Sequence, residues 1–174
     1  EPRPLLGGLA FEDASGDPAR PIYDFSLAVE RVAAAVEAVR RLPVPYVLTA
    51  RAENFLHGRP DLDDTIKRLQ AFEKAGAEVL FAPGLRTLEQ IRAVCGSVSR
   101  PVNVVMGLAG IDLSVQQLAE AGAKRISLGS SLARLALAAT LRGGREIRDQ
   151  GSFGFAKDAL PSAEANGLMR GKGA

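Results

Sequence analysis

A similar pattern occurs twice in the chain, at Lys74-Ala-Gly-Ala-Glu-Val-Leu and at Glu120-Ala-Gly-Ala-Lys-Arg-Ile. Each copy begins where an amphipathic stretch ends, and each runs directly into aliphatic residues. Glycine adopts the positive φ that closes a helix C-terminus, so Gly76 and Gly122 are expected to end one helix each. A helix that leads at once into a strand is typical of α/β proteins with a parallel sheet.

Five short apolar segments rich in β-branched residues are expected to be strands. They are Leu5–Phe11, Tyr46–Ala50, Val79–Phe81, Val102–Met106 and Arg125–Leu128. Helical spacing of apolar residues predicts helices over Ser26–Arg40 and Asp61–Ala75. The Ser/Thr-x-x-Gln capping boxes at Thr87 and Ser114 predict the starts of two more helices. This alternation of strands and helices predicts an α/β fold whose parallel sheet is covered by helices.

Five βα units fit two architectures. The expected strands start about 30 residues apart on average, and a barrel of ~250 residues uses about 31 residues per unit. This spacing suits part of an eight-stranded barrel, and it equally suits a complete five-stranded doubly wound sheet. From Gly151 the sequence has scattered glycines and no long period, with a short helix expected around Ser162–Leu168. We therefore expect the βα units in residues 1–150 and a helical tail in residues 151–174.

Composition argues against several classes of partner and compartment. Lys and Arg total 22 against 20 Asp and Glu, and a net charge of +2 predicts neither a nucleic-acid nor a membrane partner. The longest apolar runs, such as Val44–Ala50, are far shorter than the ~20 residues of a membrane span. The single cysteine, Cys95, cannot form an internal disulfide and lies on the apolar side of a helix. We expect it to be buried in a protein of a reducing, cytoplasmic compartment.

Polar residues follow the expected strands at their carboxyl ends, where parallel α/β folds bind ligands. Glu12 and Asp13 follow the first strand, Arg51 and Glu53 the second, and Gly107 the fourth. Carboxylates bind Mg²⁺ together with water, and arginine binds a carboxylate or phosphate through two parallel hydrogen bonds. These residues predict a site for a divalent cation and an anion. The structural alternatives are an N-capping Asp13 and a plain Arg51–Glu53 ion pair.

Two other features have a functional and a structural interpretation. Gly129-Ser130-Ser131 could hold a phosphate on free backbone N–H groups, or it could simply cap a helix. His57 is the only histidine and lies in a loop, where a surface position is expected. The sequence shows no nucleophile–base pair, no Cys/His metal spacing and no Walker-type glycine loop.

Five segments carry a resemblance that no single one would support. They are Gly8-Leu-Ala-Phe-Glu-Asp-Ala, Tyr46-Val-Leu-Thr-Ala-Arg-Ala-Glu-Asn-Phe-Leu, Ala75-Gly-Ala-Glu-Val-Leu-Phe-Ala-Pro-Gly, Pro101-Val-Asn-Val-Val and Lys124-Arg-Ile-Ser-Leu-Gly-Ser-Ser. In order and spacing they resemble the isocitrate lyase/phosphoenolpyruvate mutase superfamily, over about residues 7–165. The chain is most similar to its short bacterial members of the phosphonomutase-like and carboxyvinyl-carboxyphosphonate phosphorylmutase-like type.

The resemblance implies a (β/α)8 TIM barrel, of which this chain would hold strands four to eight. It also implies Mg²⁺-dependent chemistry on a small 2-oxo or 2-hydroxy carboxylate, with a C–C or P–C bond cleaved or rearranged through an enolate-type intermediate. By position, Glu12 matches the family's metal-holding acid, and Asp13 beside it is a second candidate ligand. Arg51 matches the arginine that binds the substrate carboxylate or phosphonate. Glu53 matches an acidic residue found beside that arginine in mutase-like members, and the resemblance implies that Arg51 and Glu53 are catalytic.

The gating loop of this chain departs from the family pattern. It reads Ala14-Ser-Gly-Asp-Pro-Ala-Arg-Pro and lacks the Cys and Lys of the family's loops, so Arg20 is its one candidate substrate contact. Pro83 stands where the lyases have Glu. Neither lyase nor mutase activity is therefore expected to transfer intact, and decarboxylase and hydrolase activities stay open.

The resemblance further implies an upstream part and a partner. The family's first three βα units supply metal-binding aspartates, and their absence here predicts a fragment that lacks the N-terminal third. Family members are commonly tetramers that exchange the last barrel helix, and the apolar residues of Ser130–Asp149 predict a homo-oligomer, either a dimer or a tetramer. Ordinary packing of that stretch on its own strand is the alternative. If the chain is a whole protein, a non-enzymatic binding or assembly subunit is the alternative to an enzyme.

Overall fold

The computed structural model describes residues 7–170. Leu5 and Leu6 of the first expected strand lie outside these residues, as do the last four positions of the expected tail. The chain divides into two compact units, the first ending at Gly129 and the second beginning at Ser130. The boundary that we expected from the sequence lies further along the chain, between residues 150 and 151. Each unit is described below by itself.

The first unit is a series of strands and helices along the chain. Its elements are β1 (Gly7–Glu12), α1 (Phe25–Arg40), β2 (Tyr46–Arg51), the 3₁₀ helix η1 (Asn54–His57), α2 (Leu62–Lys74), β3 (Val79–Phe81), α3 (Leu88–Ser97), β4 (Val102–Val105), α4 (Val115–Glu120) and β5 (Arg125–Ser127). The strands pair in the order β1-β2-β3-β4-β5, and every pair is parallel. A doubly wound sheet reverses its strand order, whereas a barrel does not. The α/β fold and its assignment to part of a barrel are thus confirmed.

Local sequence signals set the helix ends. Thr87 and Ser114 each accept a bond from the backbone N–H three residues on, and Gln90 and Gln117 complete the two capping boxes. After α2 and α4 the chain turns at Gly76 and Gly122, with φ of 103° and 100°. Only glycine adopts these angles without strain, so the repeated Ala-Gly-Ala pattern acts as predicted.

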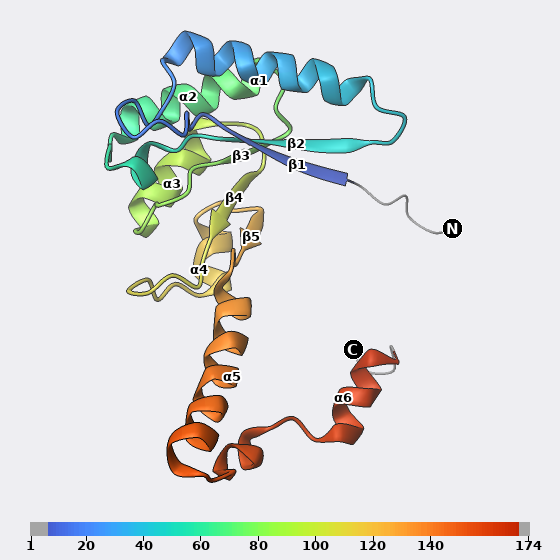
Figure 1. The fold of residues 1–174 in the computed structure, drawn as a ribbon. Helices are drawn as coiled ribbons and strands as arrows, with labels where there is room; N and C mark the ends of the chain where they lie inside the picture. Colours follow the sequence, from blue (N-terminus) through green and yellow to red (C-terminus); the bar gives the residue numbers. More distant parts are fainter. Residues whose placement is uncertain (1–6, 171–174) are drawn as a thin grey trace. The chain divides into compact units, whose positions relative to one another are not determined.

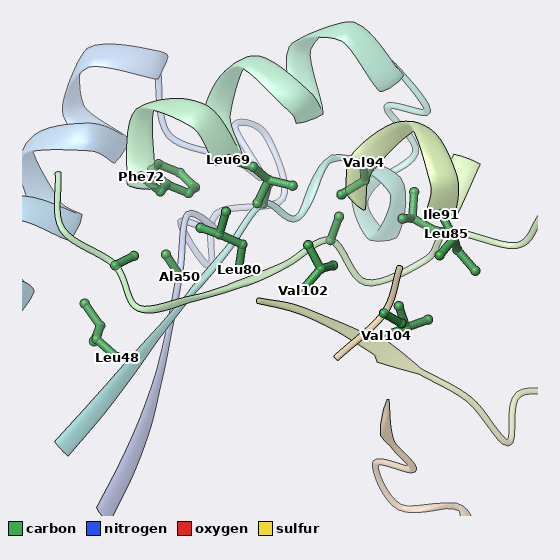
Figure 2. Close-up of a cluster of buried hydrophobic side chains, with 14 of the residues drawn as sticks. Leu48, Ala50, Leu69, Phe72, Leu80, Leu85, Ile91, Val94, Val102 and Val104 are labelled. Carbon is green, nitrogen blue, oxygen red and sulfur yellow. The ribbon is translucent and has the colours of Figure 1, made fainter. Parts of the chain in front are cut away.

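The hydrophobic core lies between the sheet and helices that cover one of its faces. Helices α1, α2 and α3 lie along that face (Figure 1). Figure 2 shows Leu69 and Phe72 of α2 beside Leu80 and Ala50 of the sheet, and all four are fully buried. Each large side chain of this kind contributes about 1.5–3 kcal/mol by leaving water.

Alternation along β2 places polar residues on the other face of the sheet. Leu48 and Ala50 belong to the hydrophobic core, so Thr49 and Arg51 point to the opposite side. Asn103 of β4 and Arg125 of β5 lie on this side too, because Arg125 Nε donates to Asn103 Oδ1 at 2.9 Å and its Nη2 donates to Thr49 Oγ1 at 3.2 Å. The face of the sheet opposite the hydrophobic core therefore carries polar side chains. One of them, Arg51, belongs to the site described below.

The second unit comprises α5 (Ser131–Gln150), the 3₁₀ helix η2 (Gly154–Asp158) and α6 (Ser162–Met169). Glu146 of α5 accepts bonds from the Ser152 hydroxyl at 2.6 Å and the Phe155 amide at 3.0 Å. These bonds join α5 to the segment that follows it. The helix expected near Ser162–Leu168 is present as α6.

Across residues 7–170, none of the helices combines the length and the apolar character that crossing a membrane requires.

Candidate active site at the carboxyl ends of the strands

The last residues of three neighbouring strands of the first unit lie side by side. Glu12 is the last residue of β1, Arg51 the last of β2 and Phe81 the last of β3. The strand register pairs Glu12 with Arg51 and Arg51 with Phe81. Residues paired across parallel strands point to the same face, so the three side chains are neighbours at the carboxyl edge of the sheet.

The guanidinium group of Arg51 is held from three directions. Its Nε donates to Glu53 Oε1 at 2.7 Å, and its Nη1 lies 3.4 Å from Glu12 Oε2. Its central carbon lies 5.1 Å from the centroid of the Phe81 ring, a cation–π contact. The Arg51–Glu53 ion pair, which the sequence offered as the structural alternative, is therefore present, and Glu12 lies beside the same arginine. A guanidinium oriented in this way presents its remaining N–H donors in a fixed direction.

Glu53 is a buried carboxyl next to a half-exposed one. Its residue is only 3% exposed, whereas the Glu12 side chain is 50% exposed. Burial raises the pKa of Glu53 above its ordinary value of 4.5, and the nearby charges of Glu12 and Asp13 act in the same direction. The ion pair with Arg51 opposes this shift. Glu53 thus holds Arg51 from the protein side, and Glu12 faces solvent.

Asp13 has a different position from the one expected for a metal ligand. It is 2% exposed. Its Oδ1 accepts the Glu53 amide at 2.8 Å, and its Oδ2 accepts Arg68 Nη1 at 3.0 Å. Burial raises its pKa, against the opposing effects of the Glu53 amide and Arg68. Because both oxygens serve donors of the protein itself, Asp13 supports the strand ends, and Glu12 is the carboxylate accessible to a cation.

The donor set fits one side of a magnesium site. Within residues 7–170 no group of three or more His, Cys, Asp or Glu side chains is arranged to hold a metal ion. Mg²⁺, however, commonly keeps several waters and takes only one or two protein carboxylates together with its substrate. The exposed carboxylate of Glu12 meets that lesser requirement, directly or through water.

Two other expected site residues, Arg20 and Gly107, lie in the loops that follow β1 and β4. The Arg20 side chain is 88% exposed, with Nε 4.0 Å from Asp17 Oδ2. Gly107 follows β4 with a φ of 78°, and Gly129 follows β5 with a φ of 52°. The substrate-binding roles of Arg20 and Gly107 stay predictions.

The remaining candidates have ordinary positions. His57 is exposed in η1, as expected for a surface histidine. Cys95 is half-buried rather than fully buried, and burial raises the pKa of its thiol.

Two residues of the site were missed at the sequence level. Arg68 of α2 binds Asp13, and it also donates from Nη1 to the Tyr23 carbonyl at 3.0 Å and from Nε to Asp64 Oδ2 at 2.8 Å. Its spacing of four residues from Asp64 was a signal, but such pairs usually lie on a solvated helix face. The sequence predicted Phe81 as the last residue of a strand. Its contact with Arg51 depends on the register between β2 and β3, which the sequence alone does not give.

Comparison with known proteins identifies the family. Residues 6–148 match the family model described as phosphoenolpyruvate phosphomutase. The chain belongs to this family. The resemblance inferred from the five sequence segments is thereby confirmed, and so is membership of the phosphoenolpyruvate mutase/isocitrate lyase superfamily.

Three known proteins are similar to this chain. A crystal structure described as a lyase/mutase from Burkholderia cenocepacia J2315 is 52% identical, with a TM-score of 0.88, and the match covers 93% of this chain and 58% of that one. The oxaloacetate decarboxylase of Paraburkholderia xenovorans (strain LB400) is 38% identical over 89 residues, which are 51% of this chain and 28% of the decarboxylase. A phosphonopyruvate hydrolase in complex with oxalate and Mg²⁺ is 24% identical, with a TM-score of 0.75 and coverage of 94% and 58%, and shows the shared fold.

The chain therefore spans less than two thirds of the length of these relatives.

Proposed function

We propose that the protein containing this chain is a Mg²⁺-dependent enzyme that acts on a small 2-oxo or 2-hydroxy carboxylate. It would cleave or rearrange a C–C or P–C bond through an enolate-type intermediate. The observation that carries this proposal is Arg51, which is oriented by Glu53 and Phe81 beside the exposed carboxylate of Glu12. A fixed guanidinium next to an accessible carboxylate suits an anion that also binds a cation.

Arg51 would bind the substrate anion. A guanidinium has five N–H donors, and the contacts to Glu53 and Glu12 use two of them. The remaining donors can bind one carboxylate or phosphonate group through two parallel hydrogen bonds. Because Glu53 and Phe81 fix the plane of the guanidinium before the substrate arrives, little reorganisation is needed when negative charge develops on the bound anion.

Glu12 would hold the metal ion. A bound Mg²⁺ would supply positive charge to stabilise the oxygen of an enolate. Glu53, which the sequence suggested as a catalytic residue, would act through Arg51, because its carboxylate accepts a hydrogen bond from that arginine. Asp13 would hold the Glu53 backbone in place.

The names of two relatives guide the choice of substrates to test. One is an oxaloacetate decarboxylase and another a phosphonopyruvate hydrolase, and both names refer to small 2-oxo acids. The direct test is a screen of the full-length protein with Mg²⁺ against oxaloacetate, phosphonopyruvate and methylisocitrate, with EDTA as the control. We expect Mg²⁺-dependent turnover of at least one of them. Absence of turnover, together with absence of Mg²⁺-dependent binding of oxalate as an enolate mimic, would contradict the proposal.

We also propose that the full-length protein is a homo-oligomer that associates through α5. This helix carries several exposed leucines, namely Leu132, Leu135, Leu137 and Leu141, each at least 47% exposed. A cluster of apolar side chains of this kind favours burial against a second copy. Light scattering of the full-length protein should give the mass of a dimer or tetramer, and the mass of a monomer at high concentration would contradict this.

A further inference from the structure

Arg68 lies at the centre of a buried charge network behind the site. Its side chain is 7% exposed, and the Asp13 side chain that it pairs with is fully buried. Arg68 Nη1 donates to Asp13 Oδ2 and to the Tyr23 carbonyl, both at 3.0 Å, and Nε donates to Asp64 Oδ2 at 2.8 Å. A single side chain of α2 therefore binds one residue of its own helix and two groups of the segment between β1 and α1.

The groups that Arg68 binds lead directly to the two strand ends that carry the site. Asp13 follows Glu12 in sequence, and its other oxygen accepts the Glu53 amide at 2.8 Å. Asp64 Oδ2 also accepts a bond from Asn54 Nδ2 at 2.7 Å, and Asn54 follows Glu53. Arg68 thus connects to β1 through Asp13 and to the segment after β2 through both Asp13 and Asp64.

Stability alone does not explain such a network. Desolvation of buried charges offsets most of their mutual attraction, so a buried ion pair adds little net stability compared with apolar residues of the same size. The network does restrict geometry, because each donor and acceptor has one partner direction. Moving the segment after β2 relative to the end of β1 would break the Asp13 bond to the Glu53 amide.

We propose that Arg68 is a positioning residue for the anion and metal site. It fixes the Asp13 carboxylate, which fixes the Glu53 backbone, which in turn places the Glu53 side chain that orients Arg51 against Glu12. This inference rests on the proposed function for its effect on substrate binding, whereas its structural part, the placement of the Glu53 backbone, does not. Lysine cannot replace Arg68, because one ammonium on a flexible stem cannot reach Asp13, Tyr23 and Asp64 together.

The first measurement is the affinity of the full-length protein for oxalate in the presence of Mg²⁺. Arg68→Lys is the main variant, and Asp64→Asn, which keeps the size of the side chain, is the second in case the first fails to fold. We expect Arg68→Lys to raise the Kd for oxalate at least about tenfold, because the loss of one charged hydrogen bond to the anion changes an equilibrium constant by about this factor or more. Asp64→Asn is expected to act in the same direction.

Gln70→Ala is the matched control. Gln70 lies on the same helix and joins it to another segment by a bond from Nε2 to the Ser97 carbonyl at 2.9 Å. This substitution should lower stability without changing the Kd for oxalate. An unchanged Kd in Arg68→Lys and Asp64→Asn would overturn the proposal, as would a loss of affinity in Gln70→Ala equal to theirs.

The second measurement separates the inference from the proposed function. Hydrogen exchange of the Glu53 amide reports its bond to Asp13, and the Ala52 amide, which donates to the Phe81 carbonyl at 2.9 Å, reports the neighbouring strands. We expect Arg68→Lys or Asp64→Asn to speed exchange at Glu53 at least tenfold and to leave Ala52 unchanged. If the wild type does not bind oxalate but this selective change occurs, the proposed function fails and the positioning role stands. Equal changes at both amides, or none at Glu53, would overturn the positioning role.

Discussion

Replacing Arg51 by lysine is expected to remove most activity of the full-length protein while leaving its fold nearly intact. Lysine keeps the positive charge but loses the planar fork, so it cannot bind Glu53 and also present two parallel donors to a substrate. The loss of one preorganised donor of this kind costs about 10²–10³ in rate, or roughly 2.7–4 kcal/mol. We therefore expect kcat/KM to fall by at least about tenfold.

The effect on stability should be small. The Arg51 side chain is 24% exposed, and its neighbour Glu12 is half-exposed. Ion pairs that solvent reaches, such as the one with Glu12, contribute about 0–1 kcal/mol, and the ammonium of lysine keeps a positive charge beside the buried carboxylate of Glu53. The free energy of unfolding should therefore change by less than about 1 kcal/mol.

The assay combines kinetics with thermal unfolding for Arg51→Lys and for a control, Arg86→Lys. Arg86 is an exposed arginine whose Nη2 donates to the Ala109 carbonyl at 3.2 Å, and its replacement should alter neither quantity. If Arg51→Lys instead loses stability and keeps its activity per folded molecule, the arginine is structural and the proposed anion site is wrong.

Two further predictions concern stability. Gly122→Ala should lower the free energy of unfolding by more than about 1–2 kcal/mol, the cost of a left-handed conformation for an L-residue, because Gly122 has a φ of 100° and an added Cβ would lie 2.9 Å from the Cβ of Cys95. Denaturant unfolding beside Gly96→Ala, where an added Cβ meets no atom within 4 Å, checks this, and equal effects of the two substitutions would contradict it. Burial disfavours the charge of Asp64, but hydrogen bonds from Arg68 and Asn54 outweigh burial and lower its pKa below the ordinary 3.8. Its contribution to stability is therefore present above pH 3.8 and is lost as the pH falls through the lower pKa of the folded state. The difference in unfolding free energy between the wild type and Asp64→Asn should shrink as the pH is lowered through and below 3.8, and a constant difference would contradict the argument.

Local signals in the sequence predicted most of the first unit. The capping boxes at Thr87 and Ser114 and the helix-ending Gly76 and Gly122 act through neighbours in sequence, so they can be recognised without a tertiary structure. The strand order is different, because it depends on which strands pair at long range. The average spacing of the units suited a barrel and a doubly wound sheet equally, and only the pairing of each strand with the next excludes the second.

The site shows the same division between local and long-range information. Glu12, Arg51 and Glu53 could be predicted because they end or follow strands, and the carboxyl ends of parallel strands meet at one edge. The role of Asp13 could not, since it depends on Arg68, which is 55 residues away in sequence. Asp64 and Arg68 have the spacing of a surface ion pair, and only the packing of α2 against the sheet turns Arg68 towards Asp13.

The most direct test of the central claim is a titration of the full-length protein with oxalate, with and without Mg²⁺, for the wild type and for Glu12→Gln. Glu89→Gln is the control, because Glu89 is an exposed carboxylate in the first turn of α3. We predict that oxalate binding requires Mg²⁺, that Glu12→Gln weakens it at least tenfold, and that Glu89→Gln leaves it unchanged. Equal affinity with and without Mg²⁺, or an unchanged affinity in Glu12→Gln, would contradict the claim that Glu12 and Arg51 form a site for a metal-bound anion.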